Sequence, residues 1–333
     1  MVTETLMSQD EPRHGERATP AKRQKRRWRP SWLTWTIVTC GVLGLAVLLY
    51  PTASAWVTQY NQSQITGDYA AKAENTDPDA AQQLKLAKEY NDALTSGVEL
   101  KANAHVPSGT GTSTDPSLDY NKLLAVDKTG LMARLMIPGI DVDLPIYHGT
   151  SDETLLRGAG HLEGSHLPIG GDGTHSVITA HRGLASARMF TDLDKVKKGD
   201  TFTIQVLGEV LTYQVIDTKV VDPEDTDSLR AVEGEDLVTL VTCTPLGINT
   251  HRILVTGERV TPTPKADLER AHKQPDVPRF PWWLLILGVS TIGLGIYAWR
   301  AGYADAQLAE SRRQKRSSSD NTEPASLEAD ANE

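Results

Sequence analysis

Residues 236–260 read DLVTLVTCTPLGINTHRILVTGERV, and this stretch decides the fold. Two runs rich in β-branched residues flank the loop TPLGINT, which is typical of a strand, a turn and a second strand. In an antiparallel hairpin the start of the second strand lies opposite the end of the first. Because successive side chains alternate between faces, only one of His251 and Arg252 can share a face with Cys243.

Further short β-branched runs precede this hairpin, namely ARLMIP, VDLPIYH, HSVITAH, TFTIQVLG and EVLTYQVIDTKVV, with turn residues between them. Many short strands without long alternating helices predict a mainly β barrel or sandwich. Gly208-Glu209 is the predicted turn of one hairpin. Before the strands, the spacing of apolar residues predicts an amphipathic helix over Ala80 to Gly97. Residues 105–117 are rich in Gly, Pro, Ser and Thr and predict a loop.

Two apolar runs without charged residues flank this region, WLTWTIVTCGVLGLAVLLY at 32–50 and FPWWLLILGVSTIGLGIYAW at 280–299. At ~1.5 Å per residue, each helix would nearly match a ~30 Å hydrocarbon core. Lys and Arg precede the first run and follow the second, so both termini are predicted to be cytoplasmic and the region between them external. The first run also has features of a signal peptide, with ASA at 53–55 as a cleavage site, but its length favours an uncleaved anchor.

These patterns predict a domain organisation along the 333-residue chain. It comprises a basic cytoplasmic tail (1–31), a membrane helix (32–50), an N-terminal helix with a lid-like loop (51–130), a β domain (131–260), a Pro-rich stalk (261–279), a second membrane helix (280–299) and a disordered cytoplasmic tail (300–333). The chain holds 34 Lys and Arg against 43 Asp and Glu, a net charge of −9. This charge argues against nucleic acid as a partner.

The two cysteines are too few for a disulfide framework. Cys40 lies within the first apolar run, where a small apolar filler is the simplest interpretation. Cys243 lies in the external domain, where a cysteine without a partner is buried and inert, paired between chains, or a reactive thiol. A cation beside it would favour the nucleophilic thiolate.

A thiol that transfers acyl groups also needs a histidine to protonate the leaving amine. His181 follows the strand SVITA at a strand exit, a position that often carries site residues. His251 and His175 remain alternatives from the residues alone. His161 and His166 do not supply tetrahedral metal-ligand spacing with one cysteine, and the sequence carries no phosphate- or dinucleotide-binding motif. We therefore expect no metal and no organic cofactor.

Five blocks of the sequence together resemble the sortase family, and most closely its class C, the pilin-polymerising sortases of Gram-positive bacteria. They are LPIYHGT (144–150), GAGHLEGSHLPIGG (158–171), THSVITAHRGL (174–184), MFTDLDKVKKGD (189–200) and LVTLVTCTPLGINTHRILVTGER (237–259). The last block contains the TLxTC pattern of the family. The resemblance implies an eight-stranded β-barrel with short helices, preceded by an N-terminal helix and flanked by two membrane helices. It also implies Cys243 as nucleophile, with His181 and Arg252 as the other catalytic residues.

The implied activity is that of a cysteine transpeptidase in the cell membrane. Such an enzyme cleaves an LPXTG-like sorting signal between Thr and Gly through a thioester and transfers the acyl group to a lysine amine of another pilin subunit. The alternatives are attachment of surface proteins to peptidoglycan through lipid II, simple hydrolysis, and a non-catalytic adhesin.

Class C sortases usually carry a lid with an Asp-Pro-aromatic motif over the active site. The nearest match in this chain is Asp115-Pro116-Ser117, within a lid candidate that begins at His105. A serine cannot supply the aromatic plug, so the sequence predicts weak autoinhibition.

Overall fold

The computed structural model describes residues 27–95, 98–99, 108–109, 112–113, 115 and 117–320. The chain divides into two compact units. The larger comprises residues 45–287, and the smaller combines residues 1–44 with residues 288–333.

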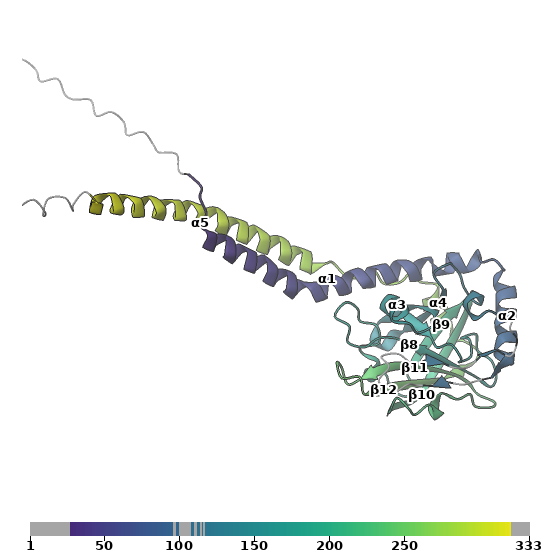
Figure 1. The fold of residues 1–333 in the computed structure, drawn as a ribbon. Helices are drawn as coiled ribbons and strands as arrows, with labels where there is room; N and C mark the ends of the chain where they lie inside the picture. Colours follow the sequence, from purple (N-terminus) through teal and green to yellow (C-terminus); the bar gives the residue numbers. More distant parts are fainter. Residues whose placement is uncertain are drawn as a thin grey trace, which may run out of the picture. The chain divides into compact units, whose positions relative to one another are not determined.

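Eight strands of the larger unit form a closed barrel in the order β10-β12-β11-β8-β7-β6-β5-β9 (Figure 1). The β6–β7 and β8–β11 pairs are parallel, whereas the other neighbouring pairs are antiparallel. The predicted eight-stranded barrel is therefore confirmed. The strands are β5 (Leu131–Ile137), β6 (Val142–His148), β7 (Ala159–His161), β8 (Thr174–Thr179), β9 (Thr201–Val206), β10 (Glu209–Val221), β11 (Asp236–Thr244) and β12 (His251–Val260).

Apolar side chains of the strands fill the barrel and make up most of one continuous core. Phe202 and Tyr213 stack in it with ring centroids 5.6 Å apart. Gly257 lies against this pair, because a Cβ atom at that position would stand 2.6 Å from the Phe202 ring. The β12 backbone thus approaches the rings at a distance that only glycine allows.

Leu207 and Gly208 form the turn between β9 and β10, since Val206 pairs with Glu209. The predicted Gly208-Glu209 turn is thus wrong by one residue. Both turn residues have positive φ, 45° and 90°. This is the requirement of a type I′ turn, whose twist matches that of the flanking strands.

Short elements surround the barrel. They are α2 (Ala80–Ala93), α3 (Asp152–Arg157), α4 (Lys265–Ala271), the two-residue strands β1 (Leu94–Thr95), β2 (Val98–Glu99), β3 (Ser108–Gly109) and β4 (Thr112–Ser113), and the 3₁₀ helices η1 (Tyr120–Lys122), η2 (Pro138–Ile140), η3 (Leu193–Lys195) and η4 (Asp227–Leu229). The helix predicted over 80–97 is confirmed as α2, although it ends at Ala93.

Asp79 caps α2, and its side chain accepts a hydrogen bond from the Gln82 backbone N–H at 2.8 Å. We expect Asp79→Ala to lower the free energy of unfolding by ~1 kcal/mol, because one N–H of the first turn loses its acceptor. Gln82→Ala keeps that backbone donor and its acceptor, so it serves as the control. Equal unfolding midpoints in urea for the two variants would contradict this assignment.

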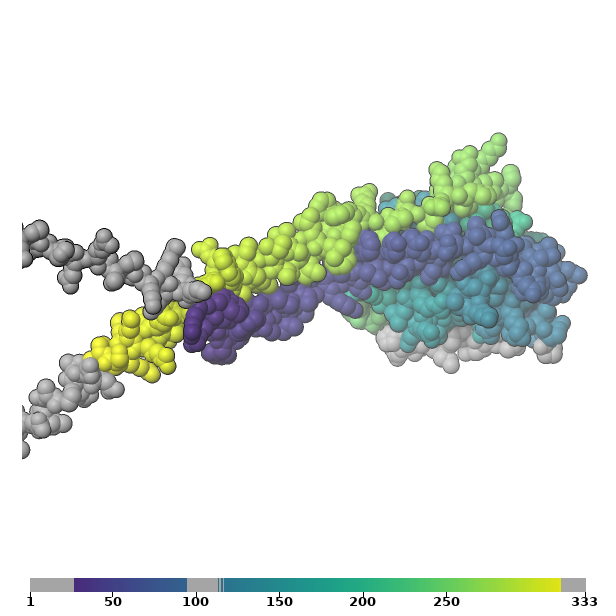
Figure 2. All heavy atoms as spheres, turned by 90° about the horizontal axis from the view of Figure 1, so that it is seen from above, coloured from purple at the N-terminus to yellow at the C-terminus, as the bar shows by residue number. Residues whose placement is uncertain are grey.

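The first long helix, α1 (Trp32–Glu74), continues well past the predicted span through Pro51. Its C-terminal part belongs to the larger unit and lies along the surface of the barrel domain (Figure 2). The buried Tyr69 hydroxyl donates to the Met132 carbonyl at 3.0 Å and accepts from the Leu207 N–H at 2.9 Å. These bonds tie α1 to β5 and to the β9–β10 turn.

The segment predicted as a Pro-rich stalk, 261–279, contains α4, which packs on β9 and β10. Asp267 is buried and accepts from the Thr212 hydroxyl at 3.0 Å. Arg134 donates to the Ala271 carbonyl at 3.3 Å, at the end of the helix. The stalk was predicted from the prolines on either side of this stretch. The residues KADLERA between them have high helix propensity, and they form the helix.

In the smaller unit, the N-terminal part of α1 lies beside α5 (Trp282–Asp320). The Asp305 carboxylate accepts from the Ser31 N–H at 2.8 Å and from the Thr34 hydroxyl at 2.6 Å. The Arg29 N–H donates to the Gly302 carbonyl at 3.0 Å. Polar bonds therefore join the two helices near the start of α1.

Both α1 and α5 are long and apolar enough to cross a membrane. The tail predicted as disordered from residue 300 is helical as far as Asp320, which corrects that expectation. Its Ala, Gln, Arg and Lys residues have high helix propensity and extend the apolar helix that precedes them.

Candidate active site

Cys243 lies near the end of β11 and is half-buried. It pairs with Arg252 of β12, and Thr244 pairs with His251. Directly opposite residues of an antiparallel pair share a face of the sheet. The hairpin expected from the sequence is confirmed, and its register places Arg252, not His251, on the face of Cys243.

A cleft of about 430 Å³ opens at this end of the barrel, and both Cys243 and His181 line it. His181 follows β8, which runs parallel to β11. The cleft therefore exposes a thiol and an imidazole at one site. The other lining residues are Asp152, Leu156, Arg182, Gly183, Leu184, Gly247 and Asn249.

The β8 and β11 chains run side by side up to these two residues. The Ala180 N–H donates to the Val241 carbonyl at 3.2 Å. The buried Thr242 hydroxyl donates to the Ala180 carbonyl at 2.7 Å. His181 and Cys243 therefore leave adjacent strand ends immediately after a bonded pair.

Burial raises the pKa of the Cys243 thiol above its ordinary value, and the Arg252 guanidinium opposes part of this rise. The Arg252 side chain is itself buried, with 2% of its surface exposed. Its Nη1 donates to the carbonyls of Asn249 at 2.9 Å and His251 at 3.0 Å. The cation is thus held by the backbone of the β11–β12 hairpin.

The two alternative histidines do not line the cleft. His175 is buried, and its ring contacts the Arg230 carbonyl at 2.8 Å and the Thr239 hydroxyl at 2.7 Å. His251 points elsewhere, with Nε2 3.3 Å from the Asp222 carboxylate. Position alone thus favours His181 as the partner of the thiol.

His161 and His166 belong to a buried hydrogen-bond network, in which His161 Nε2 donates to the His166 carbonyl at 2.8 Å. Within the described ranges, no group of three or more His, Cys, Asp or Glu residues is arranged to hold a metal ion.

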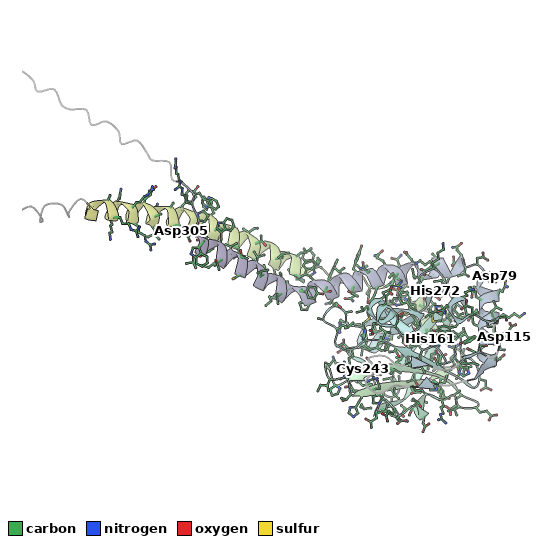
Figure 3. The ribbon with its side chains drawn as sticks, in the orientation of Figure 1. Asp79, Asp115, His161, Cys243, His272 and Asp305 are labelled. Carbon is green, nitrogen blue, oxygen red and sulfur yellow. The ribbon has the colours of Figure 1, made fainter. Side chains whose placement is uncertain are left out.

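Of the three residues named for the lid, Asp115, Pro116 and His105, the structure describes Asp115. Asp115 is exposed, and Figure 3 shows it on the opposite side of the domain from Cys243. The pairing of Ser113 with Leu94 ties the neighbouring chain to the end of α2. Asp115 therefore does not cover the cleft, while Pro116 and His105 lie outside the described residues.

Sequence reasoning missed several cleft residues, above all Asp152 and Leu156 of α3 and Arg182 of the loop after β8. The residues of α3 reach the cleft through tertiary packing, which no local pattern encodes. Arg182 did carry a signal, since it directly follows a histidine at a strand exit.

Comparison with known proteins shows the family to which the chain belongs. Residues 135–260 match the sortase domain family. Sortase D of Bacillus subtilis (strain 168) is 31% identical over 158 residues, which cover 46% of this chain and 76% of that protein.

Among solved structures, sortase C1 from Streptococcus agalactiae is 44% identical with a TM-score of 0.52, covering 60% of this chain and 100% of that one. Sortase C-1 from Streptococcus pneumoniae is also 44% identical, with a TM-score of 0.52 and coverage of 60% and 99%. The chain belongs to the sortase family of cysteine transpeptidases, and sortase C enzymes are among its structural neighbours.

Proposed function

We propose that this chain is a membrane-anchored transpeptidase that polymerises pilins. It cleaves an LPXTG-like sorting signal between Thr and Gly and joins the new acyl group to a lysine amine of another pilin subunit. The observation that carries the proposal is the shared cleft of Cys243 and His181, with Arg252 opposite Cys243 in register. The similarity to a pilus-related sortase C of group B Streptococcus, 38% identical with a TM-score of 0.52, supports the pilin class.

In the first step, the Cys243 thiolate attacks the Thr carbonyl carbon, a C–S bond forms and the Thr–Gly C–N bond breaks. His181, protonated at this stage, gives its proton to the leaving glycine amine. The products are a thioester on Cys243, a neutral His181 and a peptide with a free amino terminus.

In the second step, a neutral lysine amine attacks the thioester carbonyl, the new C–N bond forms and the C–S bond breaks. His181 takes the excess proton of the amine, and Cys243 leaves as the thiolate. The starting protonation state returns and an isopeptide bond joins the two subunits. Arg252 supplies a fixed positive charge for the developing oxyanion or for the bound signal.

The two apolar helices and the basic residues at their outer ends support a two-pass topology, with cytoplasmic termini and an external catalytic domain. In this arrangement residues 131–260 form the catalytic barrel, and residues 51–130 and 261–279 connect it to the membrane helices. Membrane lipid and LPXTG-bearing pilins are the proposed partners.

The test uses the full chain in lipid nanodiscs with a peptide that contains Leu-Pro-Glu-Thr-Gly. A lysine peptide with a blocked α-amine, or purified lipid II, is added as the acceptor, and mass spectrometry identifies the ligated amine. We expect a thioester on Cys243 and ligation to the lysine side chain, with neither product in Cys243→Ala.

Ligation to lipid II alone would replace pilin polymerisation by attachment to peptidoglycan. Labelling by a thiol-reactive sorting-signal analogue that is the same in Cys243→Ala and in the unchanged chain would overturn the enzymatic assignment and favour an adhesin.

A further inference from the structure

The residues that flank His181 are hydrogen-bonded to the residues that flank Cys243. On the inner side, the Thr242 hydroxyl donates to the Ala180 carbonyl at 2.7 Å. On the outer side, Arg182 Nη1 donates to the Thr244 hydroxyl at 2.8 Å. The two proposed catalytic residues thus sit between two matched cross-links.

The inner cross-link lies beside a backbone hydrogen bond of the same two chains, from the Ala180 N–H to the Val241 carbonyl, whereas the outer one depends on the Arg182 side chain. The paired register of β8 and β11 ends at Thr179 and Val241, so the sheet pairing does not extend to His181 and Cys243. Arg182 bridges this gap with a side chain that is only 9% exposed.

Arg182 has two further anchors besides Thr244. Its Nε donates to the Thr191 carbonyl at 3.1 Å, and its Nη2 forms an ion pair with Asp194 at 2.8 Å. The Gly183 N–H also donates to the Thr191 hydroxyl at 3.2 Å. The loop that carries His181 is therefore bonded to the segment at η3 and, through one guanidinium, to the strand that carries Cys243.

The planar guanidinium suits this task, because it offers five donors in a rigid fork. Its charge is compensated by Asp194, and each of its three nitrogens contacts a protein acceptor. These contacts indicate a side chain that holds protein segments together.

We propose that Arg182 is a positioning residue that sets the separation and orientation of His181 relative to Cys243. This inference rests on the proposed function of those two residues. Proton transfer from an imidazole needs hydrogen-bond geometry, and a misplacement of ~1 Å can cost ~100-fold in rate. Loss of the Arg182 bridge would therefore impair chemistry more than substrate binding.

The test compares Arg182→Met and Thr244→Val with a matched control in the full chain in nanodiscs. Arg188→Met is the control, because Arg188 lies in the same connection and pairs with Asp192 at 2.8 Å but does not line the cleft. Thr244→Val removes the hydrogen bond from Arg182 but keeps the charge of Arg182. It therefore distinguishes an effect of lost positioning from an effect of lost charge.

With the Leu-Pro-Glu-Thr-Gly peptide, we expect Arg182→Met to lower kcat by ~10- to 100-fold with KM within threefold of the unchanged chain. Thr244→Val should lower kcat less, and the double variant should be no worse than Arg182→Met, because both changes remove one bridge. Arg188→Met should stay within twofold.

A second readout does not need the sorting signal, namely the pH dependence of Cys243 alkylation by iodoacetamide. We expect Thr244→Val and Arg182→Met to move its midpoint in the direction of His181→Ala, while Arg188→Met leaves it in place. Failure of the unchanged chain to cleave the peptide would refute only the proposed function. The alkylation midpoints would still show whether Arg182 positions His181 relative to Cys243.

Three results would overturn the inference. Arg182→Met could behave like Arg188→Met in both readouts. KM could rise while kcat is retained, which would make Arg182 a substrate-binding residue. Activity could fall only in proportion to the unfolded fraction, with an unchanged alkylation midpoint, which would make its role one of stability alone.

Discussion

Replacement of Arg252 by methionine is expected to lower kcat/KM for the sorting-signal peptide by ~100- to 1000-fold, the range observed when a donor to an oxyanion is removed. Arg252 lies opposite Cys243 and opposes the rise in the pKa of this thiol that burial causes. In the proposed mechanism, its loss removes the charge that faces the oxyanion, and it also removes the effect of the guanidinium on the Cys243 thiol. The pKa of Cys243 should therefore rise further, and the rate of alkylation at neutral pH should fall.

Arg259→Met provides the matched control for this prediction. Arg259 lies in the same strand, but its guanidinium stands over the Tyr213 ring, 5.7 Å from the ring centroid, and does not line the cleft. Peptide cleavage and the pH profile of iodoacetamide alkylation measure both effects. An alkylation midpoint for Arg252→Met that equals that of Arg259→Met would refute the electrostatic role.

The features that the sequence predicted well are local ones. Cys243 and Arg252 are nine positions apart in one hairpin, so alternation and antiparallel pairing suffice to place them together. The barrel strands were recognisable because β-branched runs alternate with turn residues. The choice of His181 among several histidines came from the resemblance to sortases, because β8 pairs with β11 across a long sequence separation.

The features that the sequence predicted poorly depend on tertiary contacts or on fine competition between neighbouring residues. The turn between β9 and β10 lies one residue earlier than predicted, because Leu207 as well as Gly208 adopts positive φ. The helix α4 forms where prolines suggested a stalk, since packing of Ala271 and Asp267 on the barrel stabilises it. The helix α3 has a local capping signal, Ser151 before Asp152 and Glu153, but its place at the cleft depends on tertiary packing.

Acidification is expected to destabilise the barrel through its buried histidines. Burial lowers the pKa of His161 to about 3, and it also lowers the pKa values of His148, His166 and His175. In the unfolded chain a histidine has a pKa of ~6.5, so below that pH the unfolded state binds more protons. The stability that these histidines contribute is therefore complete above pH ~6.5 and falls as the pH falls toward the folded value.

Between pH 7 and pH 5, His161 alone should cost ~2 kcal/mol, because 1.5 pH units below the unfolded pKa correspond to ~1.4 kcal/mol each. Urea unfolding of the full chain in detergent, followed by hydrogen exchange of the barrel strands, measures this loss. His161→Gln should reduce the loss by about that amount, since an amide does not titrate, although it weakens the contacts to Tyr120 and His166 at both pH values.

His251→Gln is the control for this experiment, because His251 is exposed at the barrel end and pairs with Asp222. Its replacement should leave the difference between pH 7 and pH 5 nearly unchanged. Comparison of the two variants therefore shows whether the loss of stability on acidification comes from the buried His161 or from an exposed histidine. If His161→Gln loses as much stability on acidification as the unchanged chain, the acid sensitivity must come from carboxylates, since their ion pairs also weaken at low pH.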